Sequence, residues 1–478
     1  MKKPFNWEQL MEWEKKYFLN PLLTAEEVPI ARKIAEKVDQ HFIYLSDGTK
    51  LLDMVSGYYS CNVGLKHPKI SQAIREATED FGFVGEVCFA NPYTPIAAKI
   101  LVEDILGPDK WCGGVRFVST GSEAVEMALQ VAKLYTNRPN IITRQWAYHG
   151  WTLGSGACSR LRSVARYLSS ATEPGYQPLP GADVPGVFVV PGHNCYRCSL
   201  GHKYPDCKNK GDGTLPCVSL TESMILSIGA ETVAAMITEI AYGASNIAPA
   251  PEYYPQLVKM LKKYGILWID DEVICGFGRL GAWFGYQKYG GGAKPDIMTM
   301  AKGLISSQLP AGGVAVSKEI AQLLNTHRWT SVPTFSEHPV VMAAVIANLE
   351  VLIEEKVIEN SAKIGEYIGK KLAELQEKHK CIGYFSGSGC LWNVELVKNK
   401  AKQEPFVAED RGAILGHNIA NWPVNIVGAK ALEKGVLFEG FQPNCMNISP
   451  NCTITPELVD IAMDALDYGL TELDKMCD

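Results

Sequence analysis

The stretch Ile266-Leu267-Trp268-Ile269-Asp270-Asp271-Glu272-Val273 joins an apolar run to three consecutive acidic residues. A short apolar run of this kind is consistent with a buried strand, and ligands of open α/β sheets lie at the carboxyl ends of such strands. Three buried acids are costly unless they are paired or functional. We therefore interpret the segment as a strand that delivers a carboxylate able to hold a protonated ring nitrogen. An acidic cluster that caps a helix is the alternative.

The rest of the chain repeats this alternation. Between about residues 60 and 330, short apolar runs such as 115–118, 141–143 and 235–237 alternate with amphipathic helical stretches. This pattern predicts βαβ units, a mainly parallel sheet and the α/β fold class. Beyond residue 330, a helical pattern at 340–355 and strand-like pieces such as 389–394 predict a smaller α+β domain.

These patterns divide the chain into three parts. The polar, helix-like residues 1–50 end in a turn at Ser46-Asp47-Gly48, and we assign 1–58 to an N-terminal segment that joins the small domain. Residues 59–330 form the large domain and residues 331–478 form the C-terminal small domain. A loop-like insertion at 186–218, rich in Gly, Pro and Cys, interrupts the large domain.

Composition excludes several classes of protein. The 478 residues are 47% apolar and 21% charged, which is typical of a soluble globular protein and rules out wholesale disorder. The net charge of −6 lacks the excess of basic residues that is typical of proteins that bind nucleic acid or anionic membranes. The N-terminus lacks the apolar region of a secretory signal, and no apolar run is long enough to span a membrane. We expect a cytoplasmic protein, whose 14 cysteines are thiols or metal ligands.

The segment Ser119-Thr120-Gly121-Ser122-Glu123-Ala124 follows a strand-like run and opens a helix. Free backbone N–H groups at a helix start, beside a glycine that permits close approach, form a cradle for phosphate. The alternative is a capped helix in which Ser122 only satisfies the first turn.

Two further motifs follow strand-like runs. Trp146-Ala147-Tyr148-His149-Gly150 carries aromatic residues that can stack on a planar cofactor, although an aromatic core residue before a turn is the alternative. Thr299-Met300-Ala301-Lys302-Gly303 holds a lysine among small residues, where burial lowers the pKa and favours a Schiff base with an aldehyde; a surface lysine is the alternative. Cradle, aromatic residue, carboxylate and lysine together are the set that pyridoxal phosphate requires.

With these motifs the sequence resembles the class III aminotransferases, the ω-amino acid family of fold type I pyridoxal-phosphate enzymes. The resemblance covers nearly the whole chain, from Leu52-Asp53 to Thr453-Ile454-Thr455. Besides the segments above it includes Gly276-Phe277-Gly278-Arg279, the N-terminal stretch 57–64 and the segment Thr334-Phe335-Ser336 with His338-Pro339. It implies a large pyridoxal-phosphate-binding domain and a homodimer with sites at the interface, and it leaves tetramers open.

The resemblance also implies roles for single residues. Lys302 is expected to hold the cofactor covalently and to shuttle protons, and Asp271 to pair with the ring nitrogen. The remaining positions are expected to surround the cofactor or the substrate: Val273 and Tyr148 on the two ring faces, Gly121 and Ser122 at the phosphate, Glu239 near the cofactor hydroxyl, Thr334 at the phosphate of the neighbouring subunit, and Tyr59 in the substrate pocket.

Two departures from the family pattern concern the substrate. Many members that use glutamate, ornithine or 4-aminobutyrate have arginine directly after the His-Gly pair, where this chain has Trp151, and many have a second arginine near the C-terminus, where 435–450 contains none. Some other cation must then hold the acid group of the substrate. The candidates are Arg162 and Arg411, although exposed arginines that form surface pairs are the alternative.

The insertion contributes Cys195, Cys198, Cys207 and Cys217 in the pattern CxxC-x8-C-x9-C. Four thiolates at this spacing suit tetrahedral Zn²⁺ or an iron–sulfur cluster, with free thiols as the alternative. The insertion is also similar to one found in transaminases that act on taurine.

We therefore expect an ω-aminotransferase that moves the amino group of taurine or a similar ω-amino acid to pyruvate or 2-oxoglutarate by a ping-pong mechanism. The alternatives are a transaminase for β-alanine or 4-aminobutyrate and an aminomutase or racemase on the same scaffold. Outside enzymes, the alternatives are a regulatory protein of this fold and a redox sensor built on the cysteine cluster.

Overall fold

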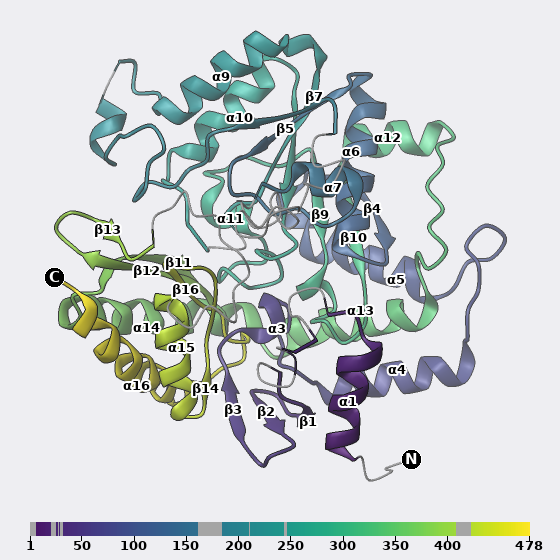
Figure 1. The fold of residues 1–478 in the computed structure, drawn as a ribbon. Helices are drawn as coiled ribbons and strands as arrows, with labels where there is room; N and C mark the ends of the chain where they lie inside the picture. The colour runs from purple at the N-terminus through teal and green to yellow at the C-terminus, as the bar shows by residue number, and fades with distance from the viewer. Residues whose placement is uncertain are drawn as a thin grey trace.

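Seven strands form the central sheet of the protein, which we describe from a computed structural model (Figure 1). The structure describes residues 6–20, 25–26, 28, 32–160, 184–209, 211–242, 246–407 and 422–478. In spatial order the strands are β4 (Cys112–Val118), β10 (Gly312–Ser317), β9 (Ile297–Met300), β8 (Leu267–Asp271), β7 (Val233–Thr238), β5 (Asn140–Arg144) and β6 (Val187–Val190). β10 runs antiparallel to both of its neighbours and the other pairs are parallel, which confirms a mainly parallel sheet.

Helices cover this sheet because its strands are apolar on both faces. Every residue of β7, β9 and β10 is buried, as expected for a sheet enclosed by helices. The helix α6 (Gly121–Thr136) packs against β9 and β10, and α10 (Tyr253–Lys263) packs against β8. The other helical segments of this part are α5 (Tyr93–Lys99), η1 (Ile100–Ile105), η2 (Gly107–Asp109), α7 (Leu153–Cys158), η3 (Asp206–Asn209), α9 (Pro216–Ile228), η4 (Ala230–Thr232), α11 (Gly285–Tyr289), η5 (Lys302–Leu304) and α12 (Lys318–Thr326).

The N-terminal region differs from the helical expectation. It begins with a helix, α1 (Trp7–Tyr17), but continues as the strands β1 (Ala35–Val38), β2 (Phe42–Leu45) and β3 (Lys50–Asp53). The aromatic and β-branched run 42–45 favours a strand, and the predicted turn at 46–48 joins β2 to β3 as an antiparallel pair. β3 then pairs in parallel with β14 (Val436–Leu437), so this region is joined to the C-terminal part of the chain. The short helix α3 (Ser56–Tyr59) and α4 (Pro68–Asp80) follow.

The C-terminal region forms a second sheet below the first (Figure 1). Its strands are β11 (Ile382–Ser388), β12 (Leu391–Asn399), β13 (Glu404–Pro405), β15 (Glu439–Gln442) and β16 (Cys445–Ile448), and its helices are α14 (Val357–Lys378), α15 (Pro423–Glu433), α16 (Pro456–Leu473) and η6 (Asp474–Met476). The predicted helix at 340–355 is α13 (Pro339–Glu354), which packs against α4 and α5. No described helix is both long and apolar enough to cross a membrane.

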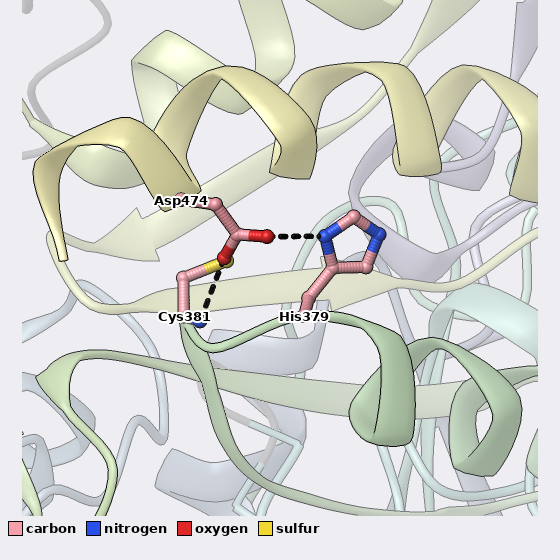
Figure 2. Close-up of side chains that lie close together, drawn as sticks. All are labelled: His379, Cys381 and Asp474. Atoms are coloured by element: carbon pink, nitrogen blue, oxygen red, sulfur yellow. Dashed lines mark hydrogen bonds and ion pairs between the residues drawn. The ribbon is translucent and has the colours of Figure 1, made fainter.

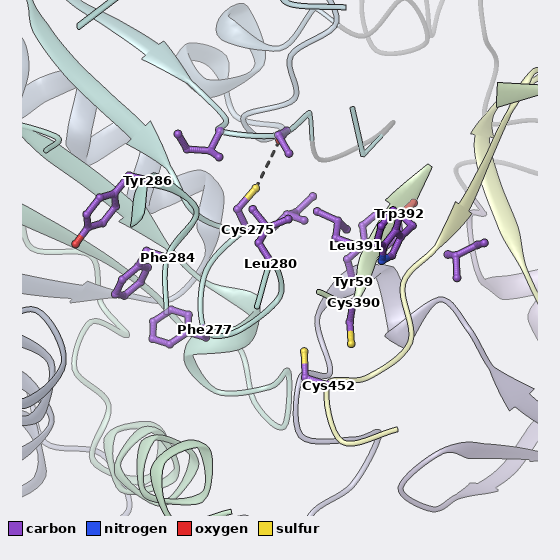
Figure 3. Close-up of a cluster of buried hydrophobic side chains, with 14 of the residues drawn as sticks. Tyr59, Cys275, Phe277, Leu280, Phe284, Tyr286, Cys390, Leu391, Trp392 and Cys452 are labelled. Atoms are coloured by element: carbon purple, nitrogen blue, oxygen red, sulfur yellow. Dashed lines mark hydrogen bonds between the residues drawn. The ribbon is translucent and has the colours of Figure 1, made fainter. Parts of the chain in front are cut away.

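A continuous core joins the three regions. Figure 3 shows Phe277 and Phe284 from the loop after β8 in the same buried cluster as Cys390, Cys452 and Tyr59 from the other two regions. The guanidinium of Arg279, which is fully buried, donates to backbone carbonyls of Cys390 and Pro450 and to Asn62 Oδ1 at 2.6 Å. One buried cation therefore ties the loop after β8 to both the N-terminal and C-terminal regions.

The insertion is more regular than the loop expected there. Residues 187–190 form β6, which pairs with β5 at the edge of the central sheet, and helix α9 begins at Pro216. The run Val187-Phe188-Val189-Val190 has the β-branched and aromatic composition of a strand. The four cysteines lie between or at the ends of these elements.

Candidate active site

The predicted motifs meet at the carboxyl ends of β8 and β9. A Cβ built on Gly121 would lie 3.3 Å from Val273 Cγ1 and 3.3 Å from Ala301 Cβ. The first turn of α6, the residue after the β8 carboxylates and the residue before Lys302 are therefore in direct contact. Glycine at position 121 keeps this junction open, and it brings the free N–H groups of the helix start close to the strand ends.

Asp271 is held by three neighbours. Its Oδ2 lies 2.7 Å from Nδ1 of His149, and its Oδ1 accepts hydrogen bonds from Thr299 Oγ1 at 2.9 Å and from the backbone N–H of Val273 at 3.1 Å. The carboxylate is almost completely buried. Its position and orientation are thus fixed by residues of three different segments.

The other two acidic residues of the motif, Asp270 and Glu272, point to the opposite face of the sheet from Asp271. Asp270 is fully buried, and burial together with the nearby Glu272 raises its pKa well above the usual range. Burial also raises the pKa of Glu272 to about 7, although the backbone N–H of Tyr286 donates to Oε1 at 2.9 Å. Because successive side chains of a strand point to opposite faces, Asp271 alone points toward the junction with Gly121 and Lys302.

Lys302 follows β9 in a strained backbone conformation. Its φ of 41° lies in the left-handed region, which a non-glycine residue adopts at a cost and which is concentrated at functional sites. Burial lowers the pKa of its amine to about 8, against the opposing charges of Asp271 and Glu239. A lysine with this pKa is partly neutral at physiological pH and is therefore a competent nucleophile and base.

Tyr148 lies beside Glu239, one of the two carboxylates whose charges act on Lys302. The backbone N–H of Tyr148 donates to Glu239 Oε2 at 3.3 Å. Burial and the charges of Asp271 and Glu239 raise the pKa of the Tyr148 hydroxyl, so the ring stays neutral. The predicted aromatic residue and the predicted glutamate therefore belong to the same site.

A buried arginine supports Glu239 from behind. Arg144 ends β5, is fully buried, and donates to the backbone carbonyl of Glu239 and, at 3.0 Å, to the Tyr254 hydroxyl. Its Nη1 lies 2.6 Å from Nδ1 of His193, whose pKa burial lowers well below the usual value. The imidazole of His193 is therefore neutral and accepts this hydrogen bond.

The start of α6 is capped by Thr120 and not by Ser122. Thr120 Oγ1 accepts a hydrogen bond from the backbone N–H of Glu123 at 3.1 Å. Ser122 Oγ instead accepts from the backbone N–H of Trp151 at 3.1 Å, which ties the helix start to the loop after the His-Gly pair. The capping interpretation of Ser122 is therefore wrong, and its hydroxyl lies at the junction between two segments of the site.

The predicted substrate and interface residues occupy more varied positions. Tyr59 is almost completely buried, with its hydroxyl bonded to Nδ2 of Asn447, whereas its neighbour Tyr58 is half exposed. Thr334 is exposed on the loop before α13. Arg162 and Arg411 lie outside the described residues.

All four cysteines of the insertion line one cavity. This cavity has a volume of about 30 Å³, and Cys195, Cys198, Cys207 and Cys217 surround it together with His202. Each of the four is a free thiol. Burial raises the pKa of Cys195 to about 11 and that of Cys217 to about 12, while the neighbouring backbone N–H groups of Ala250 and Val218 act in the opposite direction.

A separate cluster brings His379, Cys381 and Asp474 together (Figure 2). It is the one group of three or more His, Cys, Asp or Glu residues in the described part of the chain whose ligand atoms lie within 4.8 Å of one another. Nδ1 of His379 lies 2.8 Å from Asp474 Oδ2, and Nε2 lies 2.7 Å from Asp467 Oδ1. Both ring nitrogens are therefore already hydrogen-bonded to carboxylates. This arrangement clamps the start of β11 to the end of α16.

Three residues of the active site were not singled out from the sequence. His149 and Thr299 lie inside the quoted motifs, and a search for hydrogen-bond partners of Asp271 within those motifs would have found them. Arg144 follows the apolar run 141–143, and a charged residue at a strand end is the only local signal that marks it.

With this geometry established, the comparisons with known proteins identify the family. The chain matches the model of aminotransferase class-III over residues 24–470 and belongs to that family. It is 31% identical over 454 residues to a putrescine–pyruvate aminotransferase of Pseudomonas aeruginosa, covering 91% of this chain and 90% of that protein. Because the family model and the transaminase relatives agree, we conclude that this chain is a pyridoxal-phosphate-dependent transaminase of fold type I.

Solved structures agree over almost the whole chain. An S-selective transaminase from Arthrobacter sp. with alanine bound superimposes with a TM-score of 0.92 at 46% identity, covering 98% of this chain and 99% of that one. The taurine:2-oxoglutarate aminotransferase of Bifidobacterium kashiwanohense, in complex with pyridoxal phosphate and glutamate, superimposes with a TM-score of 0.87 at 28% identity, covering 99% of each chain.

The described residues fit pyridoxal phosphate. The helix start at Gly121, with free N–H groups and no side chain, suits a phosphate, and the carboxylate of Asp271 suits a protonated ring nitrogen. Lys302 supplies an amine with a lowered pKa beside both. The donor set thus matches each end of the cofactor.

Proposed function

We propose that this transaminase moves the amino group of taurine or a similar ω-amino acid to a 2-oxoacid, pyruvate or 2-oxoglutarate, by a ping-pong mechanism. The observation that carries the proposal is the junction of Lys302 and Asp271 with the start of α6, because these groups match the functional ends of one cofactor. When bound, pyridoxal phosphate supplies an electron-withdrawing ring that stabilises negative charge on the carbon bearing nitrogen.

Lys302 performs the proton transfers. With the cofactor bound, Nζ of Lys302 would be the amine that holds it, and once free and neutral it would accept the proton from the carbon bearing the donor nitrogen. The pKa of about 8 permits this, because an ordinary lysine near 10.4 remains charged at neutral pH. The same group would then deliver that proton to C4′ of the cofactor, and it would carry a proton in the opposite direction when the 2-oxoacid takes up the nitrogen in the second half of the cycle.

Asp271 keeps the cofactor ring electron-poor. Its carboxylate would pair with the ring nitrogen and hold the proton there, and His149 and Thr299 fix the position of this carboxylate. His149 is a positioning residue, because it acts through Asp271. A full negative charge on Asp271 is required, since a neutral partner does not stabilise the protonated nitrogen.

The remaining residues bind and orient. Val273 and Tyr148 would enclose the two faces of the ring, Glu239 would lie at the hydroxyl side, and the N–H groups of Gly121 and Ser122 would bind the phosphate. The contact of Gly121 with Val273 supports this placement, as does the hydrogen bond from Tyr148 to Glu239.

We propose a homodimer in which Thr334 of the partner subunit completes the phosphate site. The support is an exposed apolar surface around Thr334, where Phe335 is 63% exposed and packs edge-on against Phe83 at 6.0 Å between ring centroids. Arg116, paired with Glu86 at 2.7 Å and with Glu337, holds this surface in place. Tyr59 and Arg162 or Arg411 are proposed to contact the substrate.

The identity of the donor rests on the missing arginines and on the relatives. The similarity to a taurine:2-oxoglutarate aminotransferase supports a sulfonate donor, and Trp151 argues against a distal carboxylate. A second candidate donor is a primary amine without an acid group, with pyruvate as acceptor. The 46% identity to an S-selective transaminase with alanine bound supports pyruvate as the acceptor, because alanine is the amino acid that pyruvate forms when it takes up nitrogen.

A donor panel tests the proposal. Taurine, β-alanine, 4-aminobutyrate, ornithine and 1-phenylethylamine are each incubated with pyruvate or 2-oxoglutarate, and the new amino acid is quantified. Taurine or β-alanine is expected to react fastest, and only with a 2-oxoacid present. Preference for 1-phenylethylamine selects the second candidate. Donor consumption without any 2-oxoacid would indicate an aminomutase or racemase and would refute the proposal, as would no reaction with any pair.

A further inference from the structure

The two middle residues of the CxxC pair attach the insertion to the small-domain sheet. Tyr196 stacks on Tyr384 of β11 with ring centroids 5.0 Å apart and planes 7° apart. Arg197 pairs with Glu395 of β12, and both side chains are largely buried. Arg197 Nη1 also donates to the backbone carbonyl of Gln403 at 3.1 Å. The turn between Cys195 and Cys198 is therefore a contact between the two main regions of the molecule.

The other side of the insertion is attached to the large domain. Tyr204 and Lys208 contact the carboxylate of Glu252, at 3.0 and 3.2 Å, just before α10. The backbone N–H of Leu215 donates to Gln256 Oε1 at 2.8 Å. Two residues before Cys195, His193 bonds to Arg144, which supports the backbone of Glu239 in the active site.

Between these two attachments lies the cavity lined by the four cysteines. They come from the turn at 195–198, from η3 and from the start of α9, so no regular element spans the space. Among the described residues, no three of these sulfurs lie within 4.8 Å of one another, so they would have to move inward to reach the spacing of roughly 3.8 Å between thiolates on one tetrahedral Zn²⁺. The thiols surround a space of about 30 Å³ in place of packing against each other. Close-packed interiors contain few such spaces.

We propose that Cys195, Cys198, Cys207 and Cys217 bind a thiolate-ligated metal centre in this cavity, and that the centre braces the small domain and the His193–Arg144–Glu239 chain. Four cysteines in 23 residues supply a complete ligand set for one Zn²⁺ or one iron–sulfur cluster. The proposal does not depend on the transamination reaction.

Metal analysis of the full chain, purified without oxygen, tests this. Zinc, iron and acid-labile sulfide are measured in the wild type, in Cys198→Ser and in the control Cys477→Ser, which changes a half-buried thiol near the C-terminus. The wild type and the control are expected to contain about one zinc per chain, or about four irons with as much sulfide. Cys198→Ser is expected to retain less than about a tenth of that and to unfold at a lower temperature than the control.

A second measurement keeps the test decisive if Cys198→Ser does not fold. Native wild-type protein is alkylated with iodoacetamide before and after treatment with a chelator, and the labelled cysteines are mapped by mass spectrometry. The four cysteines are expected to react only after chelation. Two results together would overturn the proposal. The wild type would contain no stoichiometric zinc or iron, and after incubation with Zn²⁺ or with Fe²⁺ and sulfide its four cysteines would react equally with and without chelator.

Discussion

The cofactor edge of β8 and β9 and the cysteine cavity are assembled in opposite ways. The cofactor edge brings together Gly121, Tyr148, Asp271 and Lys302, which are far apart in sequence, and protein atoms already hold its key carboxylate at three points. The cavity draws four thiols from 23 neighbouring residues and leaves a space between them. Contacts within the protein hold the residues of the first site in place. In the second site, we propose that the bound metal centre holds the four thiols in place.

The largest effect is expected at the cofactor edge. Asp271→Asn keeps the shape of the side chain but removes the charge, so turnover should fall by about 10²–10³-fold as the ring nitrogen loses its partner. Steady-state kinetics with the best donor measure this loss. The metal content should stay at the wild-type level, because the two sites are separate. Turnover within about threefold of wild type would contradict the role given to Asp271.

The next effect concerns the attachment of the insertion to the small domain. Arg197→Met leaves the buried Glu395 without its cation and should lower the free energy of unfolding by about 3–5 kcal/mol. The control is Lys398→Met, which breaks an exposed pair with Asp478 and should cost less than about 1 kcal/mol. Denaturant titrations compare the two. Equal losses would show that the turn at 195–198 does not brace the small domain.

A smaller effect follows from the pKa of Lys302. Because burial lowers this pKa to about 8, the neutral amine becomes populated as the pH rises through 8. Capture of pyridoxal phosphate by the cofactor-free enzyme should therefore accelerate about tenfold between pH 7 and pH 9 and then level off. Stopped-flow absorbance measures the rate. A rate that keeps rising beyond pH 10 would indicate an ordinary lysine.

The smallest effect is expected at Trp151. Trp151 is 59% exposed and its backbone N–H, which the substitution keeps, donates to Ser122 Oγ, so Trp151→Arg should change stability by less than about 0.5 kcal/mol. The new cation should raise kcat/KM for 4-aminobutyrate relative to taurine by about three- to fivefold. Trp151→Gln, which adds no charge, is the control. The same gain in both variants would exclude a charge effect.

Local patterns predict part of this molecule well. The apolar runs at 115–118, 235–237 and 266–269 lie within or at the start of β4, β7 and β8, because hydrophobic strands are visible in short windows of sequence. The sequence pattern does not predict the strands β1 and β2. The first 50 residues are largely polar, and the antiparallel pairing of these two strands is short, so neither strand stands out as an apolar run. The parallel pairing of β3 with β14 joins residues 52 and 436, and no local pattern encodes it.

The same distinction applies to the active site. Asp271, Lys302 and the helix start at Gly121 are visible as motifs, because each follows an apolar strand. The contacts of Asp271 with His149 and of Arg144 with Glu239 depend on the order and register of strands that are distant in sequence. The cysteine pattern is visible locally, but its attachment to Glu395 through Arg197 is not.

Sodium borohydride reduction of the cofactor-loaded enzyme tests the central claim most directly. Reduction fixes the cofactor to the amine that holds it, and digestion followed by mass spectrometry locates the modified residue. One modified peptide containing Lys302 is predicted, and Lys302→Ala should yield none. Modification of another lysine in the wild type, or a modified peptide that persists in Lys302→Ala, would contradict the account.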